Sequence, residues 1–290
     1  MSLDVAEVRG ASLSLRAERK ERPTPLVAVA LLVLAFVAIL AVFGTYLAPQ
    51  NPNLQHLSTG TVGSSSAHWL GTDQLGRDIL SRVMAGTQTA VLGPLVIALG
   101  ALLISASLGI LAGYVGGRTD SVVMRLVDAG YALPSLLVVA VVVGILGGGY
   151  YVSALVLAVL FAPFDIRIIR AVALQQRSLP FIEAARTLDL SPLRIMSRHI
   201  LPNVAPFIVV NACLDFAFGL VTLSGLSFLG FGASSGSADW GLMVADGKDI
   251  IFDSPLDALA PGAMIVLLAM AVSIAGDWLY EALRPGEERR

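Results

Sequence analysis

Residues 26–43 read LVAVALLVLAFVAILAVF, eighteen consecutive positions without a polar side chain. A helix needs about 20 mostly apolar residues to cross the hydrocarbon core of a bilayer. A secretory signal peptide is the alternative, because four basic residues between Arg16 and Arg22 precede the run. A signal peptide has an apolar core of only about 7–15 residues before its cleavage site, whereas this run continues to Leu47. The stretch therefore predicts an uncleaved first transmembrane helix at 26–48.

The composition of the whole chain also indicates a membrane protein. Hydrophobic residues make up 56% of the 290 residues and charged residues 14%, and the mean hydropathy is +0.79. Soluble proteins carry about 25% charged residues, so a soluble enzyme of this composition could not cover its surface. The net charge of -2 argues against a nucleic-acid binder, which needs a basic excess. One cysteine, Cys213, and three scattered histidines predict neither a disulfide nor a metal site.

Further apolar segments complete a predicted bundle. We expect a second span near 92–114, a third from about Ser121 kinked at Pro134, a fourth ending near Asp165, a fifth at 206–228 and a sixth at 258–276. The glycines at 147–149 predict a tight reversal between spans three and four, because glycine costs backbone entropy inside a helix. Transmembrane β-strands would alternate apolar and polar residues, and these runs do not. The prediction is an all-α membrane protein with six transmembrane helices.

The basic residues predict the orientation. With six spans, both tails and the loops after even-numbered spans share one side, which holds all of the 19 Lys and Arg except Arg77, Arg82 and Lys248. Such loops face the cytoplasm, so both termini are expected there. The expected boundaries are a cytoplasmic tail at 1–25, the first helix at 26–48, an extracytoplasmic loop with an amphipathic helix at 49–88, a five-helix core at 89–285 containing a cytoplasmic loop at 167–203, and a tail at 286–290.

The cytoplasmic loop predicts two short helices. Pro180 would begin the first, and the Ser-Pro pair at 191–192 predicts an N-cap and a first helical residue for the second. Leu193, Met196 and Ile200 would share one face of that second helix. The helical hairpin would expose an apolar surface that is surrounded by basic side chains. The alternative is that its second helix lies in the membrane interface against anionic lipid.

The same loop carries a pattern known from transporters. Glu183-Ala184-Ala185, followed at the expected interval by Leu201-Pro202, resembles the EAA motif of ABC-importer permeases. Residues 68–78, HWLGTDQLGRD, are similar to the H-x-L-G-T-D-x-x-G-R-D pattern of the C-type subunit of the oligopeptide, dipeptide and nickel permease family. Segments 120–135, 226–230, 240–241 and 276–285 resemble the same family, so the likeness covers most of the chain.

The resemblance implies the type I permease fold of ABC importers, with cytoplasmic EAA coupling helices, in a bacterial inner membrane. It implies a heterodimer with a paralogous permease, two cytoplasmic ATPase subunits and an extracytoplasmic substrate-binding protein. The substrate would be a short peptide, with nickel or another small solute such as glutathione as the alternative. A secondary carrier or channel is the alternative from another class, but it would require inverted repeats or several ion-coupling residues.

No enzymatic activity is expected of the chain itself. Neither Lys20 nor Lys248 stands in the phosphate-binding pattern G-x-x-x-x-G-K-[ST]. ATP and Mg²⁺ would therefore be bound by the partner ATPases, and no catalytic residue, cofactor or metal is expected in this chain.

The resemblance assigns the ATPase-coupling residues, which are Glu183, Ala184, Ala185, Arg186, Asp189, Leu193, Arg194, Met196, Leu201 and Pro202. Asp189 stands where the family has a turn glycine, and Asp accepts the left-handed backbone conformation less readily. Glu183 would pair with a basic residue of the ATPase, and the alternative is an internal pair with Arg186.

The outer loop predicts a second functional surface. Thr72 or Asp73 would cap an amphipathic helix that begins near Ile79 and lies in the outer interface. The expected receptor-docking residues are Asp73, Arg77, Asp78, Asp239 and Trp240. The alternative is that capping and pairing by the residues of the 68–78 segment only hold the loop together.

Asp215 is the candidate for the translocation pathway. It lies eleven residues beyond Val204, or about 16 Å of helix rise at roughly 1.5 Å per residue, near mid-membrane. Ionisable residues inside spans are costly and are functional candidates by default. Asp215 would attract a cationic group in the pathway, and the alternative is a contact with the second permease. Asp165 is expected nearer the cytoplasmic side, within reach of Arg167.

Overall fold

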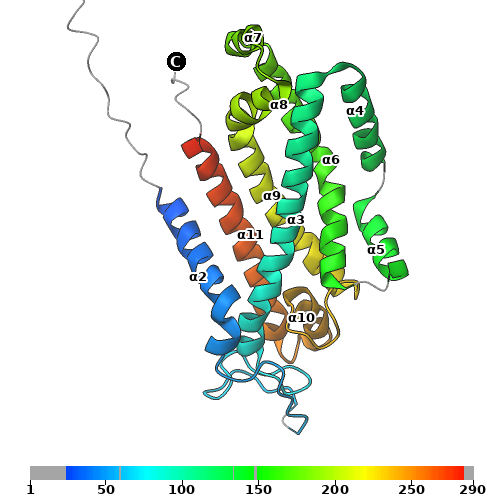
Figure 1. The fold of residues 1–290 in the computed structure, drawn as a ribbon. Helices are drawn as coiled ribbons and strands as arrows, with labels where there is room; N and C mark the ends of the chain where they lie inside the picture. The colour runs from blue at the N-terminus through cyan, green and yellow to red at the C-terminus, as the bar shows by residue number, and fades with distance from the viewer. Residues whose placement is uncertain (1–23, 59, 133, 147–148, 284–290) are drawn as a thin grey trace, which may run out of the picture.

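A computed structural model describes residues 24–58, 60–132, 134–146 and 149–283. Within these ranges the chain is helical, and its only β-pairing there is an isolated bridge between Thr72 and Asp78. The elements are α2 (Pro25–Leu47), α3 (Ile79–Val115), α4 (Gly117–Tyr131), α5 (Ser135–Leu146), α6 (Tyr150–Arg177), α7 (Pro180–Thr187), α8 (Pro192–Ile195), the π-helix η1 (Met196–Ile200), α9 (Leu201–Phe228), α10 (Trp240–Gly247), the 3-10 helix η2 (Lys248–Ile250) and α11 (Pro255–Leu283) (Figure 1). The predicted all-α class is confirmed.

The predicted spans appear as long apolar helices. Among the described residues, α2, α3, α6, the continuous helix Pro192–Phe228 and α11 are each long and apolar enough to cross a membrane. The predicted spans one, two, four, five and six fall within them. The basic tail residues and the glycines at 147 and 148, which entered the topology prediction, lie outside the described residues.

The third predicted span is two helices instead of one kinked helix. Helices α4 and α5 are bent by 83° relative to one another, and Pro134 directly precedes α5. Proline has no amide hydrogen to donate and disfavours helical backbone before it, which explains a break stronger than the expected kink. Helix α4 carries Asp120, Arg125 and Asp128, and both helices lie along the outer side of α6 (Figure 1). Together they supply the sixth candidate span.

The outer loop contains no separate amphipathic helix at the predicted place. Ile79 and the apolar residues after it form the first turns of α3, which runs 37 residues without interruption. Asp78, and not Thr72 or Asp73, is the N-cap of this helix, because its side chain accepts a hydrogen bond from the amide of Ser81. The capping interaction was expected in this segment, but it lies five or six residues further along.

Small residues bring α3 and α6 close together. A Cβ atom placed on Gly109 would lie 2.8 Å from Cγ2 of Ile169, and one on Gly113 would lie 2.7 Å from Cβ of Ala173. Such distances are shorter than van der Waals contact, so only glycine fits. Gly109 and Gly113 form a G-x-x-x-G pattern in the second span, and this pattern marks close helix packing.

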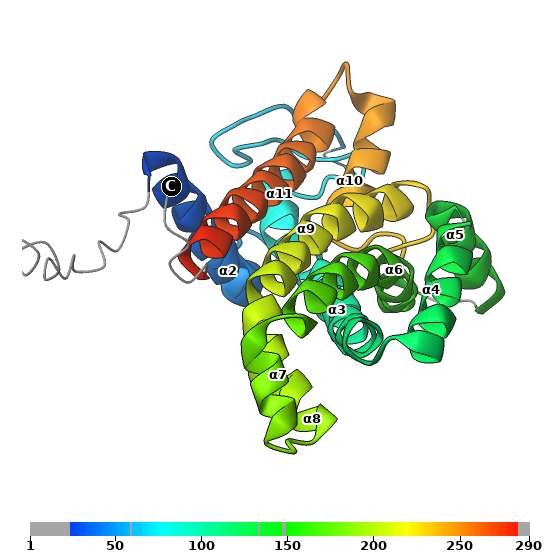
Figure 2. The same cartoon turned by 90° about the horizontal axis from the view of Figure 1, so that it is seen from above.

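The bundle has two distinct ends. The start of α2, the end of α11 and the projecting α7–α8 segment lie at one end, whereas the outer loop and α10 lie at the other (Figure 1). Seen from above, α7 and α8 extend beyond the circumference of the helix bundle (Figure 2). This arrangement places the predicted coupling loop at the same end as both described termini.

We predict that Gly113→Leu destabilises the bundle by about 1–3 kcal/mol, because a larger side chain forces α3 and α6 apart. The thermal unfolding midpoint of the detergent-solubilised protein measures the effect. Gly144→Leu is the matched control, since a Cβ there meets no atom within 4 Å. Equal midpoints for the two variants would contradict the close packing.

Candidate functional site

Helix α7 carries the Glu-Ala-Ala residues on its two faces. Pro180 occupies its first turn, where the absent amide hydrogen costs nothing. Ile182 and Ala185 are buried against the bundle, whereas Glu183 and Ala184 are exposed. Glu183 lies in the first turn, where a negative charge interacts favourably with the helix dipole. The predicted coupling residue Ala185 thus belongs to the base of the segment, and Glu183 and Ala184 belong to its surface.

The turn after α7 depends on Asp189. Its φ is +52°, and it is the only non-glycine residue with positive φ among the described residues. The amide of Asp189 donates to the carbonyl of Arg186 over 3.0 Å, and the amide of Leu190 donates to the carbonyl of Ala185 over 3.2 Å. These two bonds form a Schellman motif, which normally places glycine at this position. The expected turn is therefore formed by Asp189 in the left-handed conformation.

The second predicted helix is not a separate element. Ser191 is its N-cap residue and Pro192 follows at the first position, as expected, although no side-chain capping bond forms. The helix continues through the π-helix η1 into α9. Its buried residues are Ile195, Ile200, Val204 and Ile208. These residues are spaced by five positions and then by four, because a π-turn contains one extra residue. The prediction that Leu193 and Ile200 share one face is therefore wrong.

One apolar cluster joins the α7–α8 segment to the spanning helices. It contains Ile182 and Ala185 of α7, Ile195 of α8, Ile200 of η1, Val204 and Ile208 of α9, Ile110 and Tyr114 of α3, and Ile169 and Ala173 of α6. Leu190 and Met196 pack against its edge. The guanidinium of Arg186 lies 5.1 Å from the centre of the Tyr114 ring, so this side chain is also directed to the bundle. Displacement of the segment must therefore move these helices with it.

The exposed tip of the segment combines apolar and charged side chains. Leu188 is 74% exposed and Leu193 is 73% exposed, and they lie on the two sides of the Asp189 turn. Arg194 and Arg198 are also exposed. Leu188 was not among the predicted residues. An apolar residue in the turn between two helices could have identified it from the sequence. Leu201 and Pro202 lie further down, partly exposed at the start of α9.

The alternative internal pair of Glu183 is not formed. Among the ion pairs of the described residues, none joins Glu183 to Arg186, because Arg186 stacks on Tyr114 instead. The carboxylate of Glu183 is therefore free of Arg186 and lies on the outer surface of α7.

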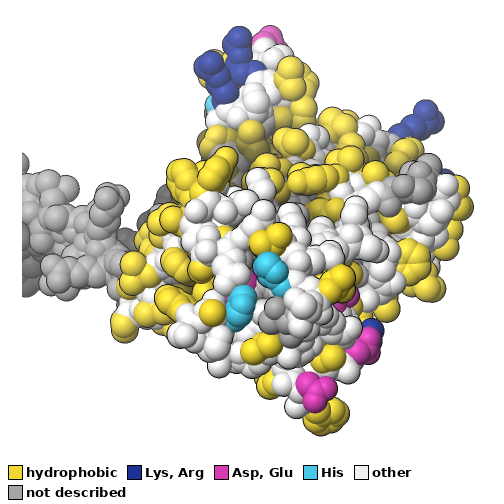
Figure 3. All heavy atoms as spheres, turned by 90° about the horizontal axis from the view of Figure 1, so that it is seen from below, with side chains coloured by type: hydrophobic (Ala, Val, Ile, Leu, Met, Phe, Trp, Pro, Cys, Tyr) yellow, Lys and Arg dark blue, Asp and Glu magenta, His cyan; other side chains and the backbone are white. Residues whose placement is uncertain are grey.

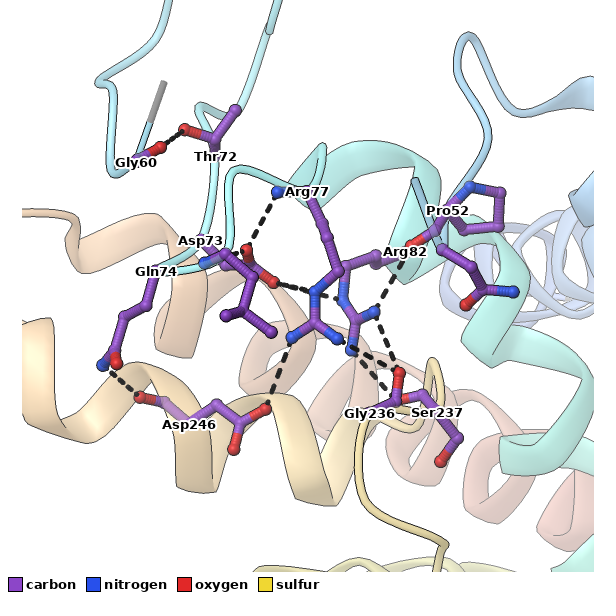
Figure 4. A network of polar contacts seen from close by, with 12 residues as sticks. Pro52, Gly60, Thr72, Asp73, Gln74, Arg77, Arg82, Gly236, Ser237 and Asp246 are labelled. Atoms are coloured by element: carbon purple, nitrogen blue, oxygen red, sulfur yellow. Dashed lines mark hydrogen bonds and ion pairs between the residues drawn. The ribbon is translucent and has the colours of Figure 1, made fainter. Parts of the chain in front are cut away.

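At the opposite end, two buried arginines bind the outer loop to α10. Asp73 accepts a 2.5 Å bond from Nε of Arg77, and Nε of Arg82 lies 3.6 Å from the same carboxylate oxygen. Both guanidinium groups donate to the carbonyl of Gly236, and Arg82 also donates to Ser237 over 2.9 Å. Figure 4 shows Arg77, from the outer loop, and Arg82, from the start of α3, pointing together to the loop that contains Gly236 and Ser237. The network fixes three chain segments beside the buried apolar cluster that contains Ile79, Val83 and Trp240.

The other predicted receptor-docking residues are structural as well. Asp78 accepts bonds from the amide and hydroxyl of Ser81 and contacts His68 Nδ1 at 3.0 Å. Nε1 of Trp240 donates to the carbonyl of Val83 over 2.9 Å, and Asp239 caps α10. Burial raises the pKa of Asp239, and hydrogen bonds led by that from the Leu242 amide act in the opposite direction.

All five predicted docking residues are therefore buried, and for Asp73, Arg77 and Asp78 this agrees with the alternative that they hold the loop together by capping and pairing. The outer surface is made by their neighbours, including Leu57, Trp69 and Phe252, which is 99% exposed. Figure 3 shows this face as mostly hydrophobic and uncharged atoms, with acidic side chains at one margin.

A cavity of about 510 Å³ lies between the α4–α5 break, α6 and α9. Asp215, Asp165 and Asn211 are buried in its wall. Asp165 lies near the middle of α6 and next to Asp215 of α9, and the expected pair with Arg167 is not among the ion pairs of the described residues. Arg167 instead bonds to Asp128 over 2.7 Å at the surface.

The described residues contain no group of three or more His, Cys, Asp or Glu side chains arranged to hold a metal ion. The polar side chains described above cap helices, form ion pairs or line the cavity between α6 and α9.

Comparison with known proteins gives the class of this chain. Residues 105–289 match the family described as the binding-protein-dependent transport system inner membrane component. The chain belongs to this family and is a multi-pass permease subunit of an ABC importer, which works with ATPase subunits in a membrane. This membership decides against a secondary carrier or channel.

Three relatives illustrate the range of the family. The chain is 34% identical over 262 residues to the probable D,D-dipeptide transport system permease protein DdpC of Escherichia coli (strain K12), covering 90% of this chain and 88% of that protein. It is 36% identical to the glutathione transport system permease protein GsiD of Pectobacterium atrosepticum, covering 89% and 86%. It is 31% identical to the nickel transport system permease protein NikC of E. coli (strain K12), covering 89% and 94%.

A solved structure shares the fold. A chain of the MetNI methionine ABC transporter, in its inward-facing conformations, superposes with a TM-score of 0.59 at 18% identity, covering 70% of this chain and 96% of that chain. The likeness confirms the predicted type I importer permease fold.

We predict that Arg82→Ala lowers the free energy of unfolding by about 3–5 kcal/mol, because it leaves the buried carboxylate of Asp73 with one cationic partner fewer. Thermal unfolding in detergent measures the loss. Arg118→Ala is the control, since Arg118 is exposed at the start of α4. A midpoint equal to that of the control would show that the outer network is not a main source of stability.

Proposed function

We propose that this chain forms half of the translocation pathway of an importer for short peptides, with a paralogous permease as the other half. The observation that carries the proposal is the similarity along about nine-tenths of the chain to permeases named for D,D-dipeptides, dipeptides and glutathione. Glutathione is itself a tripeptide, so these names share one substrate class. Nickel is the second candidate, because the nickel permease is 31% identical over a similar share of the chain.

The α7–α8 segment is the proposed docking site for a cytoplasmic ATPase. Its apolar tip, with Leu188 and Leu193, suits insertion into a groove of a partner, and Arg194 at the rim suits an acidic margin. Glu183 and Ala184 add an exposed acidic and a small residue on α7. In this proposal ATP and Mg²⁺ are bound by two ATPase subunits, and this chain has no ATPase site of its own.

The buried base of the segment supports mechanical coupling. Closely packed side chains have low compressibility, so force applied at Leu193 passes through Ile195 and Ile182 to α3, α6 and α9. The Asp189 turn fixes the angle between α7 and α8. In this proposal most of the predicted coupling residues form the exposed contact surface, and Ala185 together with Ile182 and Ile195, which were not predicted, forms the buried part that transmits movement.

An extracytoplasmic substrate-binding protein is the proposed partner at the other end. Exposed Leu57, Trp69 and Phe252 offer apolar contacts, and the network of Arg77 and Arg82 holds their loops in fixed positions. A preformed surface reduces the entropy lost on docking.

The proposed orientation places α7, α8 and both termini in the cytoplasm. We predict that a membrane-impermeant maleimide labels Gln55→Cys in intact cells but labels Arg194→Cys only after permeabilisation, with Cys213→Ser as the background of both. Both residues are exposed in the structure, so accessibility in the free protein is matched. Labelling of Arg194→Cys in intact cells would show that the proposed orientation is wrong, and the proposed coupling site would then lie outside the cell.

We predict that the complex purified with its co-assembling ATPases and receptor, placed in proteoliposomes, takes up radiolabelled dialanine in an ATP-dependent manner. Leu193→Asp should lower uptake at least tenfold, because a charge desolvated in an apolar groove is unfavourable. Glu183→Lys should lower it in the same way by reversing the charge that faces the ATPase.

Two control variants separate docking from folding. Leu193→Met keeps an apolar side chain of similar size and should retain uptake, and Arg118→Glu reverses an exposed charge outside the segment. Co-purification of the ATPases reports docking directly. Normal uptake by Leu193→Asp would contradict the coupling role, and uptake of Ni²⁺ without uptake of dialanine would favour the nickel candidate.

A further inference from the structure

The central cavity holds polar groups that no role described above explains. It is lined by Tyr131 and Ser135 at the α4–α5 break, by residues 160–165 of α6 and by Asn211, Asp215 and other residues of α9. Its volume of about 510 Å³ falls within the range of roughly 300–1,000 Å³ typical of small-ligand sites. Its rim is aromatic, with Phe164 and Phe218 exposed. The site lies near the middle of two spanning helices, which is where a translocated solute must pass.

Two carboxyl groups meet in the wall of the cavity. The side chains of Asp165 and Asp215 lie next to one another. Two carboxylates that share one buried site repel each other. The lining contains no Lys, Arg or His, and none of the ion pairs of the described residues includes either aspartate. The pair therefore lacks a cationic partner within the described part of this chain.

Two further atoms in the same wall have no hydrogen-bond partner. Oδ2 of Asp215 and Nδ2 of Asn211 are both buried without a partner, and each residue is only 7% exposed. The two residues are four positions apart and share one face of α9. An unsatisfied buried polar atom costs about 1–3 kcal/mol, and here a donor and an acceptor are left unpaired on two residues that line the cavity.

The two unpaired atoms limit the kind of ligand that the cavity would bind. Oδ2 of Asp215 accepts hydrogen bonds and attracts a cation, whereas Nδ2 of Asn211 donates to an oxygen. A bare metal ion would use the first group but not the second, because an amide NH₂ cannot coordinate a cation. A protonated amine next to a carbonyl oxygen uses both. That combination is the amino terminus of a peptide.

We propose that this cavity is a substrate subsite in which Asp215 binds the protonated α-amino group of a peptide and Asn211 donates to its first carbonyl oxygen. Asp165 is a positioning residue that holds the Asp215 carboxyl group at the wall. The inference rests on the proposed peptide function and names the part of the substrate that this permease binds. The aromatic rim of Phe164 and Phe218 leaves the peptide side chains in an apolar environment.

The test uses the complete importer in proteoliposomes with saturating receptor and radiolabelled dialanine, and uptake is expressed per assembled complex. Asp215→Asn should lower uptake at least tenfold, and Asn211→Leu should lower it several-fold. Receptor-stimulated ATP hydrolysis should persist in both variants, because the coupling segment and the outer surface are unchanged. Asp215→Glu keeps the charge and should retain most of the uptake. Asp277→Asn, on α11 and outside the cavity lining, is the matched control.

The outcomes separate the inference from the function on which it rests. If the wild-type complex imports dialanine and Asp215→Asn and Asn211→Leu match it, the subsite is overturned and the peptide function stands. If Asp215→Asn loses the second permease on purification but keeps normal uptake per assembled complex, a basic side chain of that subunit occupies the cavity, and the subsite is again overturned. If the wild-type complex imports no dialanine, both proposals fail together.

Discussion

The packing of isoleucine side chains beneath the α7–α8 segment is the interaction on which the rest of the structure depends. Ile182, Ile195 and Ile200 come from three successive elements and meet α3 and α6 in one buried cluster. Without this contact the segment would be joined to the bundle only through the helix that continues into α9, with no packing against α3 and α6. Because the cluster is apolar and closely packed, it moves as a unit and does not deform locally. A permease driven from outside its own chain requires such a connection.

The two ends of the molecule are held together by different physics. The α7–α8 end is apolar beneath and charged above, which suits a partner that approaches from water. The outer end adds Arg77 and Arg82 to the apolar cluster around Ile79 and Trp240, and their several donors satisfy carbonyls that loops leave unpaired. Loops have no repeating hydrogen-bond pattern of their own, so a buried guanidinium is an efficient way to join two of them. The middle of the bundle is also packed with apolar side chains, but there the polar groups of Asp215 and Asn211 remain partly unpaired.

Hydropathy predicted most of the helices, because crossing lipid requires long apolar runs whatever the tertiary contacts are. It was less successful where helices break or join. The third span is bent by 83° at Pro134, and the size of such a bend depends on what the two halves pack against. The predicted outer helix is the beginning of α3, since a cap at Asp78 and one a few residues earlier look alike in the sequence. The turn at Asp189 was expected because the family pattern has a glycine there, and Asp adopts the left-handed backbone although it accepts that conformation less readily than glycine does.

The sequence by itself determined the membrane setting, the helical class and the family motifs, because these depend on local composition and on residue order. Only the tertiary structure decided which side of each motif is exposed. It buried Ala185 and the five predicted receptor-docking residues, exposed Leu188, and brought Asp165 next to Asp215 from a helix fifty residues away in the chain. Burial and pairing of this kind arise from contacts between distant segments. A pattern along one chain contains the residue types for such contacts, but not the distances between them.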